Sequence, residues 1–182
     1  MKYYLLQKPE YFTGMIDILD FHKYVDYRAV IEDRAYCLPA HYMLLARRRE
    51  YAQPPDILLE PLPLFGEKAW EAVRCFMAEP LAVHFILMDE KTRESIHYYY
   101  PSFRRINGRV EVQERGKGAA LFLEGGIPED IPVVYVQEEG KIWTLAALDL
   151  LESLMRNGLC DIKLVPAEKI CGIRDGKGGT GA

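Results

Sequence analysis

The sequence lacks the features of a secreted or membrane-spanning protein. It holds only 4 cysteines in 182 residues, and these are widely spaced: Cys37, Cys75, Cys160 and Cys171. A disulfide framework belongs to small, cysteine-dense secreted chains, so this pattern excludes one. No run of about 18 uninterrupted apolar residues occurs, and the apolar start stops at Pro9, too early for the core of a signal peptide. We therefore expect a cytoplasmic protein with no membrane partner.

A positive net charge is also missing. The formal net charge is −4 at pH 7. Binding to nucleic acid depends on the neutralisation of phosphates by a basic surface, so this charge argues against a nucleic-acid partner. Two short basic clusters, Arg47–Arg49 and Arg104–Arg105, are typical of solvated faces or helix ends.

Motifs for catalysis and metal binding are absent as well. No Gly-x-Ser-x-Gly turn occurs, and the 4 histidines show no metal-ligand spacing with the cysteines. Cys37 and His41 stand close in the sequence, but Pro39 between them disfavours the helix that would bring them together. We therefore expect no catalytic residue, no metal and no cofactor.

One segment leaves an alternative open. Residues 10–65 are the hardest to interpret, and they contain Asp33, Cys37 and His41. A polar site assembled from this segment would make the protein a small enzyme or a ligand-binding domain. Such a site would be a pocket in which polar groups converge with shifted pKa values.

The composition predicts one packed domain. Apolar residues make up 49% of the chain and charged residues 27%, which are ordinary values for a globular protein. A chain of 182 residues fits one domain that folds without disulfides or metals. We predict a single α+β domain over residues 1–173, with a mostly antiparallel sheet and two amphipathic helices. A flexible glycine-rich tail is predicted over 174–182.

Short apolar runs bounded by turn residues predict the strands. We expect strands at 3–6, 16–19, 27–31, 57–59, 81–88, 94–100, 119–123, 133–136 and 160–164. Prolines on both sides of 57–59 restrict that strand to the edge of a sheet. Asn107-Gly108 predicts a tight hairpin turn that joins 103–106 to 109–113. Residues 41–49 fit a helix or an irregular segment.

Helical spacing of apolar residues predicts the two helices. The first begins near Gly66 and ends at Pro80, and the second begins with Thr144 as its N-cap and ends at Asn157-Gly158. Each helix is followed by a predicted strand, so 66–87 and 143–165 have the same order of elements. These passages fit an internal repeat of one helix–strand unit, or a chance recurrence of an order common in α+β proteins.

Aromatic and arginine residues are concentrated between 98 and 105. Consecutive tyrosines alternate across a strand, so at least one of them points away from the core. Tyr and Arg are frequent in binding hot spots. We predict a protein-binding surface made of Tyr98, Tyr99, Tyr100, Arg104 and Arg105. The alternative is a β-rich segment that simply uses β-prone residues.

Two histidines, His84 and His97, fall on the two arms of one predicted hairpin. They face each other in one register and lie on opposite faces in the other, because a slip of one residue reverses a strand. We interpret both as structural histidines.

The two ends of the chain carry recognisable patterns. The chain opens with the strand Met1–Leu6, and its closing unit Leu145–Pro166 combines an amphipathic helix, Asn157-Gly158-Leu159 and a strand ending in Val165-Pro166. These segments resemble a family of bacterial immunity proteins from polymorphic toxin loci. The resemblance implies a cytoplasmic α+β protein that binds and neutralises a cognate toxin without catalysis, and it assigns no site residues.

We therefore expect a non-enzymatic protein-binding protein, an immunity-type inhibitor of a bacterial toxin. The acidic net charge suits a basic toxin, since complementary potentials speed encounter. The alternatives are an enzyme or ligand-binding domain whose site comes from 10–65, and a structural protein that only associates with itself.

Overall fold

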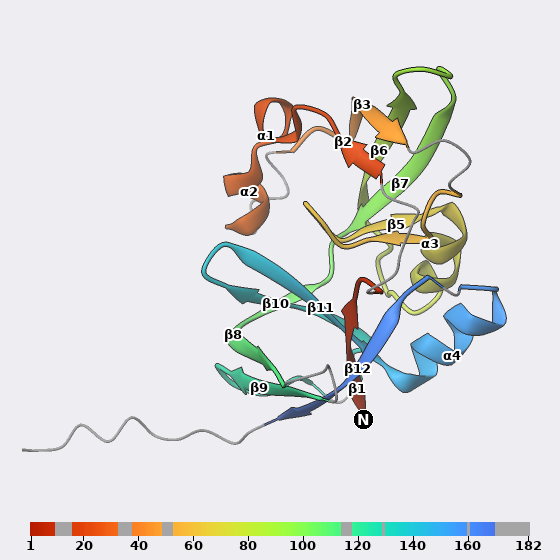
Figure 1. Cartoon of the computed structure of the whole chain (residues 1–182). Helices are drawn as coiled ribbons and strands as arrows, with labels where there is room; N and C mark the ends of the chain where they lie inside the picture. Colours follow the sequence, from red (N-terminus) through yellow and green to blue (C-terminus); the bar gives the residue numbers. More distant parts are fainter. Residues whose placement is uncertain are drawn as a thin grey trace, which may run out of the picture.

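The described part of the chain forms two β-sheets and four helices (Figure 1). The computed structural model describes residues 1–9, 16–32, 38–48, 53–113, 118–128, 130–159 and 161–169. Strands dominate this part of the chain, and the predicted α+β class is confirmed. The sheet is divided into a barrel and an open sheet, which corrects the expectation of one mostly antiparallel sheet. The predicted mobile tail, 174–182, lies outside the described residues.

The first sheet is a closed barrel of six strands in the order β1-β11-β10-β8-β9-β12. The strands are β1 (Tyr3–Gln7), β8 (Arg104–Val112), β9 (Ala119–Leu123), β10 (Val133–Glu138), β11 (Lys141–Ala147) and β12 (Lys163–Lys169). β1 closes the barrel by pairing with both β11 and β12. Aliphatic side chains fill the interior, among them Leu5, Val134, Leu145 and Val165.

The second sheet is open, with six strands in the order β2-β3-β6-β7-β5-β4. The strands are β2 (Ile16–Ile18), β3 (His41–Arg48), β4 (Ile57–Leu58), β5 (Leu64–Gly66), β6 (Ala82–Asp89) and β7 (Ser95–Pro101). β3 runs parallel to β6, and the other pairs are antiparallel. β4 lies at an edge, as the flanking prolines predict.

Both predicted amphipathic helices are present. Helix α3 (Glu67–Arg74) buries an apolar face that includes Trp70 and Val73, and α4 (Leu148–Arg156) buries three leucines. The two helices pack against each other. Gly158 ends α4 with a backbone φ of 85°, the left-handed conformation that glycine adopts without strain.

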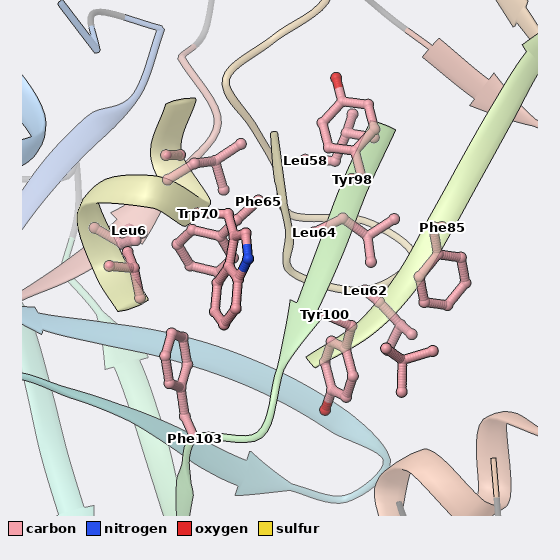
Figure 2. Close-up of a cluster of buried hydrophobic side chains, with 14 of the residues drawn as sticks. Leu6, Leu58, Leu62, Leu64, Phe65, Trp70, Phe85, Tyr98, Tyr100 and Phe103 are labelled. Carbon is pink, nitrogen blue, oxygen red and sulfur yellow. The ribbon is translucent and has the colours of Figure 1, made fainter. Parts of the chain in front are cut away.

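The core lies between the two sheets and is rich in aromatic residues (Figure 2). Phe85 on β6 stacks on Tyr42 of β3, with ring centroids 5.0 Å apart. The buried Tyr100 of β7 stacks on Tyr135 of the barrel, with centroids 5.6 Å apart. The hydroxyl of Tyr98 donates to the carbonyl of Pro55 at 2.7 Å, which satisfies its polar atom inside the core. The contact between Tyr100 and Tyr135 joins the open sheet to the barrel.

Two predicted elements have the wrong type. Tyr27–Ile31 is the short helix α2, because the carboxylate of Asp26 accepts from the amide of Ala29 at 3.0 Å and caps its first turn. The short helix α1 (Phe21–Tyr24), which the sequence did not predict, precedes it. Residues 41–48 form the strand β3, in place of a helix or an irregular segment.

One predicted turn and one predicted helix cap are also wrong. Asn107-Gly108 lies inside β8, where Gly108 pairs with Leu123 of β9. A Cβ atom at Gly108 would lie 2.7 Å from the carbonyl oxygen of Phe122, so this glycine permits close approach of two strands. Thr144 lies within β11, and α4 begins after Ala147.

The two sheets share one order and direction of strands, although β1 is the first strand of the described chain whereas its equivalent, β7, directly follows β6. Read from β8, the barrel order β8-β9-β12-β1-β11-β10 matches the open-sheet order β2-β3-β6-β7-β5-β4. Neighbouring strands also run in the same relative direction in both orders. The second and third strands are parallel, and the remaining neighbours within each order are antiparallel. The helices α3 and α4 occupy equivalent positions, before β6 and before β12. The sheets differ in closure. In the barrel the first and last strands of this order, β8 and β10, pair with each other, whereas their equivalents β2 and β4 are the two edges of the open sheet.

Candidate functional site

One face of the open sheet is turned away from the core, and we call it the open face. Side chains of a strand alternate between the two faces of its sheet, so every second residue of β3, β6 and β7 contributes. The residues that make it are His41, Met43, Leu45, Arg47, Ala82, His84, Ile86, Met88, His97 and Tyr99. Their sequence neighbours Tyr42, Leu44 and Phe85 point to the other side and are buried.

The middle of the open face is apolar and accessible. The side chains of Met43 and Leu45 are 63% and 46% exposed. Ile86 and Met88 lie beside them on β6 and are half-buried. A contiguous apolar patch on a soluble domain marks a binding surface more often than a scattered apolar residue does.

Aromatic rings form a stack along one side of the open face. Trp70 of α3 lies on Tyr99, and Tyr99 lies on His84, with ring centroids 5.6 and 4.8 Å apart. His84 in turn stacks on His97, and its Nε2 atom is 2.9 Å from Nδ1 of His97. One of these nitrogens donates and the other accepts, so the contact requires a neutral ring at the acceptor. The two histidines therefore face each other, the register that the sequence left open.

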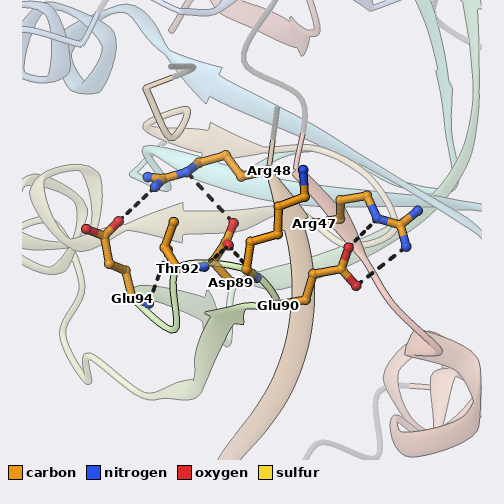
Figure 3. A network of polar contacts seen from close by, with 7 residues as sticks. Arg47, Arg48, Asp89, Glu90, Thr92 and Glu94 are labelled. Carbon is orange, nitrogen blue, oxygen red and sulfur yellow. Dashed lines mark hydrogen bonds and ion pairs between the residues drawn. The ribbon is translucent and has the colours of Figure 1, made fainter. Parts of the chain in front are cut away.

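Ion pairs border the open face at the end of β3 and β6 (Figure 3). Nε of Arg47, on the open face, is 2.6 Å from Oε1 of Glu90. Arg48 points to the opposite side of β3, where its Nη2 is 2.8 Å from Oε2 of Glu94. Exposed pairs of this kind contribute little to stability. A charged rim around an apolar centre is, however, the usual anatomy of a protein interface.

The hairpin that carries this rim is held by a buried carboxylate (Figure 3). Oδ1 of Asp89 accepts from the backbone amides of Thr92 and Lys91, at 2.8 and 2.9 Å. These hydrogen bonds, that from Thr92 above all, lower the pKa of Asp89 below its ordinary value. The turn between β6 and β7 is therefore fixed by a group that stays charged at neutral pH.

The predicted tyrosine and arginine surface is only partly accessible. Tyr98 and Tyr100 have exposed fractions of 0% and 1%, so their predicted contact with a partner is wrong. Side chains of β7 alternate between its two faces, and Tyr98 and Tyr100 lie on the inner face, which the barrel covers. Tyr99 points to the open face and is half-buried in the aromatic stack.

The two predicted arginines lie on β8 of the barrel. Arg104 is exposed. The half-buried Arg105 donates to the hydroxyl of Tyr100 at 2.8 Å and to the carbonyl of Val30. Arg105 thus ties the barrel to β7 and α2. A role of Arg104 in partner binding stays a prediction.

The alternative polar site has few described members. Asp33 and Cys37 lie outside the described residues, and His41 is exposed on the open face. No group of three or more His, Cys, Asp or Glu side chains that could hold a metal ion occurs in the described part of the chain. Other residues of the 16–61 range line a cavity between the sheets.

The histidine pair should make stability depend on pH. Burial lowers the pKa of His84, and the charges of His97 and His41 lower it further, against a smaller opposite effect of Glu67. The unfolded chain therefore takes up the proton first, and stability should fall as pH drops from about 6.5 through the lower folded pKa. Melting temperatures measured from pH 8 to pH 5 should fall less for His84→Gln than for the wild type. His22→Gln, a change at an exposed histidine, should follow the wild type, and equal slopes for all three proteins would contradict this account.

Met43 and Leu45 belong to the candidate site but were not predicted as site residues from the sequence. The run Tyr42–Ala46 is apolar on both faces of β3, which resembles a strand buried on both sides. Only the pairing of β3 shows that one of its faces is exposed.

No protein-family model matches the chain, and no curated protein matches it. Among the described residues, no helix is long and apolar enough to cross a membrane.

Proposed function

We propose that this chain is a non-catalytic, immunity-type protein that binds a bacterial toxin through the open face. The observation that carries the proposal is the apolar centre of that face, where Met43 and Leu45 are exposed on a regular strand. Two adjacent exposed apolar side chains on one sheet face cost solubility, and binding to a partner removes both from water.

The surroundings of this centre support a protein partner. Methionine and aromatic residues are enriched in interfaces, and Tyr99 and the histidine pair lie next to the apolar centre. The ion pair of Arg47 with Glu90 lies at the rim. A sheet face held by the β6–β7 hairpin is also rigid, so binding loses little conformational entropy.

The toxin partner rests on the resemblance of residues 1–6 and 145–166 to immunity proteins. The acidic net charge of −4 adds modestly to it, since it favours encounter with a basic protein.

The test is co-expression with the protein encoded by the adjacent gene. We expect the chain to form a stoichiometric complex with that protein and to relieve the growth arrest that it causes. Leu45→Asp should weaken the complex at least about tenfold, because a charge is then buried in the centre of the interface without a partner. Affinity is measured by calorimetry and protection by colony counts.

The matched control is Leu148→Asp on α4. Leu148 is a similarly exposed leucine, at 38%, but it lies on the first turn of a helix outside the open face. Aspartate is well tolerated near a helix N-terminus, so this variant should fold and bind as the wild type does. Equal loss in both variants would exclude the open face as the interface. Absence of any complex with the neighbouring protein would exclude the immunity function.

A further inference from the structure

Two histidines on neighbouring strands bring ring nitrogens together on the open face. His84 on β6 and His97 on β7 belong to one antiparallel pair of strands (Figure 1). The Nε2 atom of His84 is 2.9 Å from Nδ1 of His97. The hydrogen bond between them needs a lone pair on the accepting nitrogen, so at least one ring is neutral. A lone pair on a neutral imidazole is also what a transition-metal ion binds.

The separation of the two nitrogens restricts the geometry of a metal ion that both would bind. Imidazole nitrogens bind a divalent metal at about 2.0–2.1 Å. Two such bonds place their nitrogens about 3.4 Å apart at the tetrahedral angle and about 3.0 Å apart at a right angle. The 2.9 Å between His84 and His97 agrees with the right angle. Right angles are typical of the square-planar and tetragonal coordination of Ni²⁺ and Cu²⁺, whereas Zn²⁺ prefers tetrahedral sites.

Stacking holds the histidine rings in place. The ring of His84 lies on that of Tyr99 at an interplanar angle of 7°, and Tyr99 in turn stacks on Trp70. The rings of His84 and His97 also stack on each other, with centroids 5.0 Å apart. Both side chains stand on paired strands, so their backbone is fixed as well. Ligands that are already in position lose little conformational entropy when they bind.

The pair is accessible and its surroundings suit a transition-metal cation. His97 is exposed and His84 half-buried, so a metal ion and water can reach both rings. The negative charge of Glu67 acts on His84 and favours a cation there. The described part of the open face contains no Asp or Glu, and Mg²⁺ and Ca²⁺ require such oxygen ligands. Since the described residues offer no group of three ligands, two imidazoles are the ligands that this face supplies.

We propose that His84 and His97 together bind one Ni²⁺ or Cu²⁺ ion as neighbouring ligands at a right angle, with water in the remaining positions. Each ring binds through the nitrogen that faces the other, Nε2 of His84 and Nδ1 of His97. The proton between these nitrogens moves to the other nitrogen of the donating ring, which stays neutral. The site lies on the open face, and metal binding there does not depend on a toxin partner.

The test is a calorimetric titration of the untagged full chain with NiCl₂ near neutral pH, where both rings are neutral. We expect one Ni²⁺ per chain. Zn²⁺ should bind about three- to tenfold more weakly, because the right angle does not suit its tetrahedral preference. Mg²⁺ should not bind. Tighter binding of Zn²⁺ than of Ni²⁺ would overturn the right-angle geometry.

Substitution of either ligand locates the metal. His84→Gln and His97→Gln should each raise the dissociation constant at least about tenfold, since even the loss of an outer-shell partner weakens metal binding by that factor. His22→Gln changes an exposed histidine on α1 and should bind as the wild type does. Cys75→Ser removes an exposed thiol that can bind Ni²⁺ on its own, and it should also leave binding unchanged.

Thermal unfolding supplies a second measurement on the same proteins. A metal that binds only the folded chain raises its melting temperature, so Ni²⁺ should stabilise the wild type and His22→Gln. It should leave the melting temperatures of His84→Gln and His97→Gln nearly unchanged, and these metal-free melts also show that both variants fold. The proposal fails if the wild type does not bind Ni²⁺, or if either ligand variant binds it as tightly as the wild type.

Discussion

Phe85→Ala should destabilise the protein by about 3–5 kcal/mol, the cost of truncating a fully buried phenylalanine. Phe85 has no exposed surface and lies at the centre of β6, stacked between Tyr42 and Phe21. Its removal leaves a cavity between rings that the paired strands hold in place. For a chain of this length the melting temperature should fall by roughly 10 °C.

Phe76→Ala is the matched control for this change. Phe76 follows α3 and is 38% exposed, so its truncation should cost less than that of Phe85, about 1–2 kcal/mol. Phe85→Leu keeps most of the volume and should cost less than about 1.5 kcal/mol. Urea denaturation measures all three. Similar midpoints for Phe85→Ala and Phe76→Ala would mean that the core is not packed around Phe85.

The second large effect is expected from Gly108→Ala. The new Cβ would lie 2.7 Å from the carbonyl oxygen of Phe122 and 3.2 Å from Cα of Leu123. Both are backbone atoms of β9, so the strand itself must shift, at a cost of about 1–3 kcal/mol. Gly108 lies where β8 exchanges its pairing with β10 for pairing with β9. A shift of the backbone at Gly108 would therefore disturb the pairing of β8 with both β9 and β10.

Gly118→Ala provides the comparison. Its new Cβ would meet the amide end of the Gln113 side chain at 3.1 Å, and that side chain can move away. Alanine also reduces the entropy of the unfolded chain, so this variant should be neutral or slightly more stable. Both variants are compared by urea denaturation, and a loss in Gly118→Ala as large as in Gly108→Ala would refute the steric explanation.

Elements with clear periodicity could be predicted from the sequence. β6, β7, β9, β10 and the two longer helices follow local patterns of apolar residues, which the tertiary structure does not override. The errors have a different origin. Asn107-Gly108 suits a tight turn by local preference, but the pairing of β8 with two partners keeps it extended. Local preference also favoured a strand at Tyr27–Ile31, where the cap formed by Asp26 favours a helix.

The candidate site was less predictable because it depends on pairing between distant strands. Alternation indicates that one of three consecutive tyrosines points outward, but only the position of the barrel shows that it is Tyr99. The contact between His84 and His97 depends on a register that two strand sequences cannot fix alone. Thr144 has the sequence context of a helix cap, but it lies within β11, and α4 begins only at Leu148.

The place of β1 in the barrel has a consequence for the order of folding during synthesis. The open sheet uses only strands between Ile16 and Pro101, so all its partners leave the ribosome before β11 and β12. β1 pairs with β11 and β12 and must wait for strands at the far end of the described chain. Contacts of such long sequence separation form slowly. β1 is therefore without its partners while the residues between Gln7 and Lys141 are made, a period in which this apolar strand is open to chaperones and to aggregation.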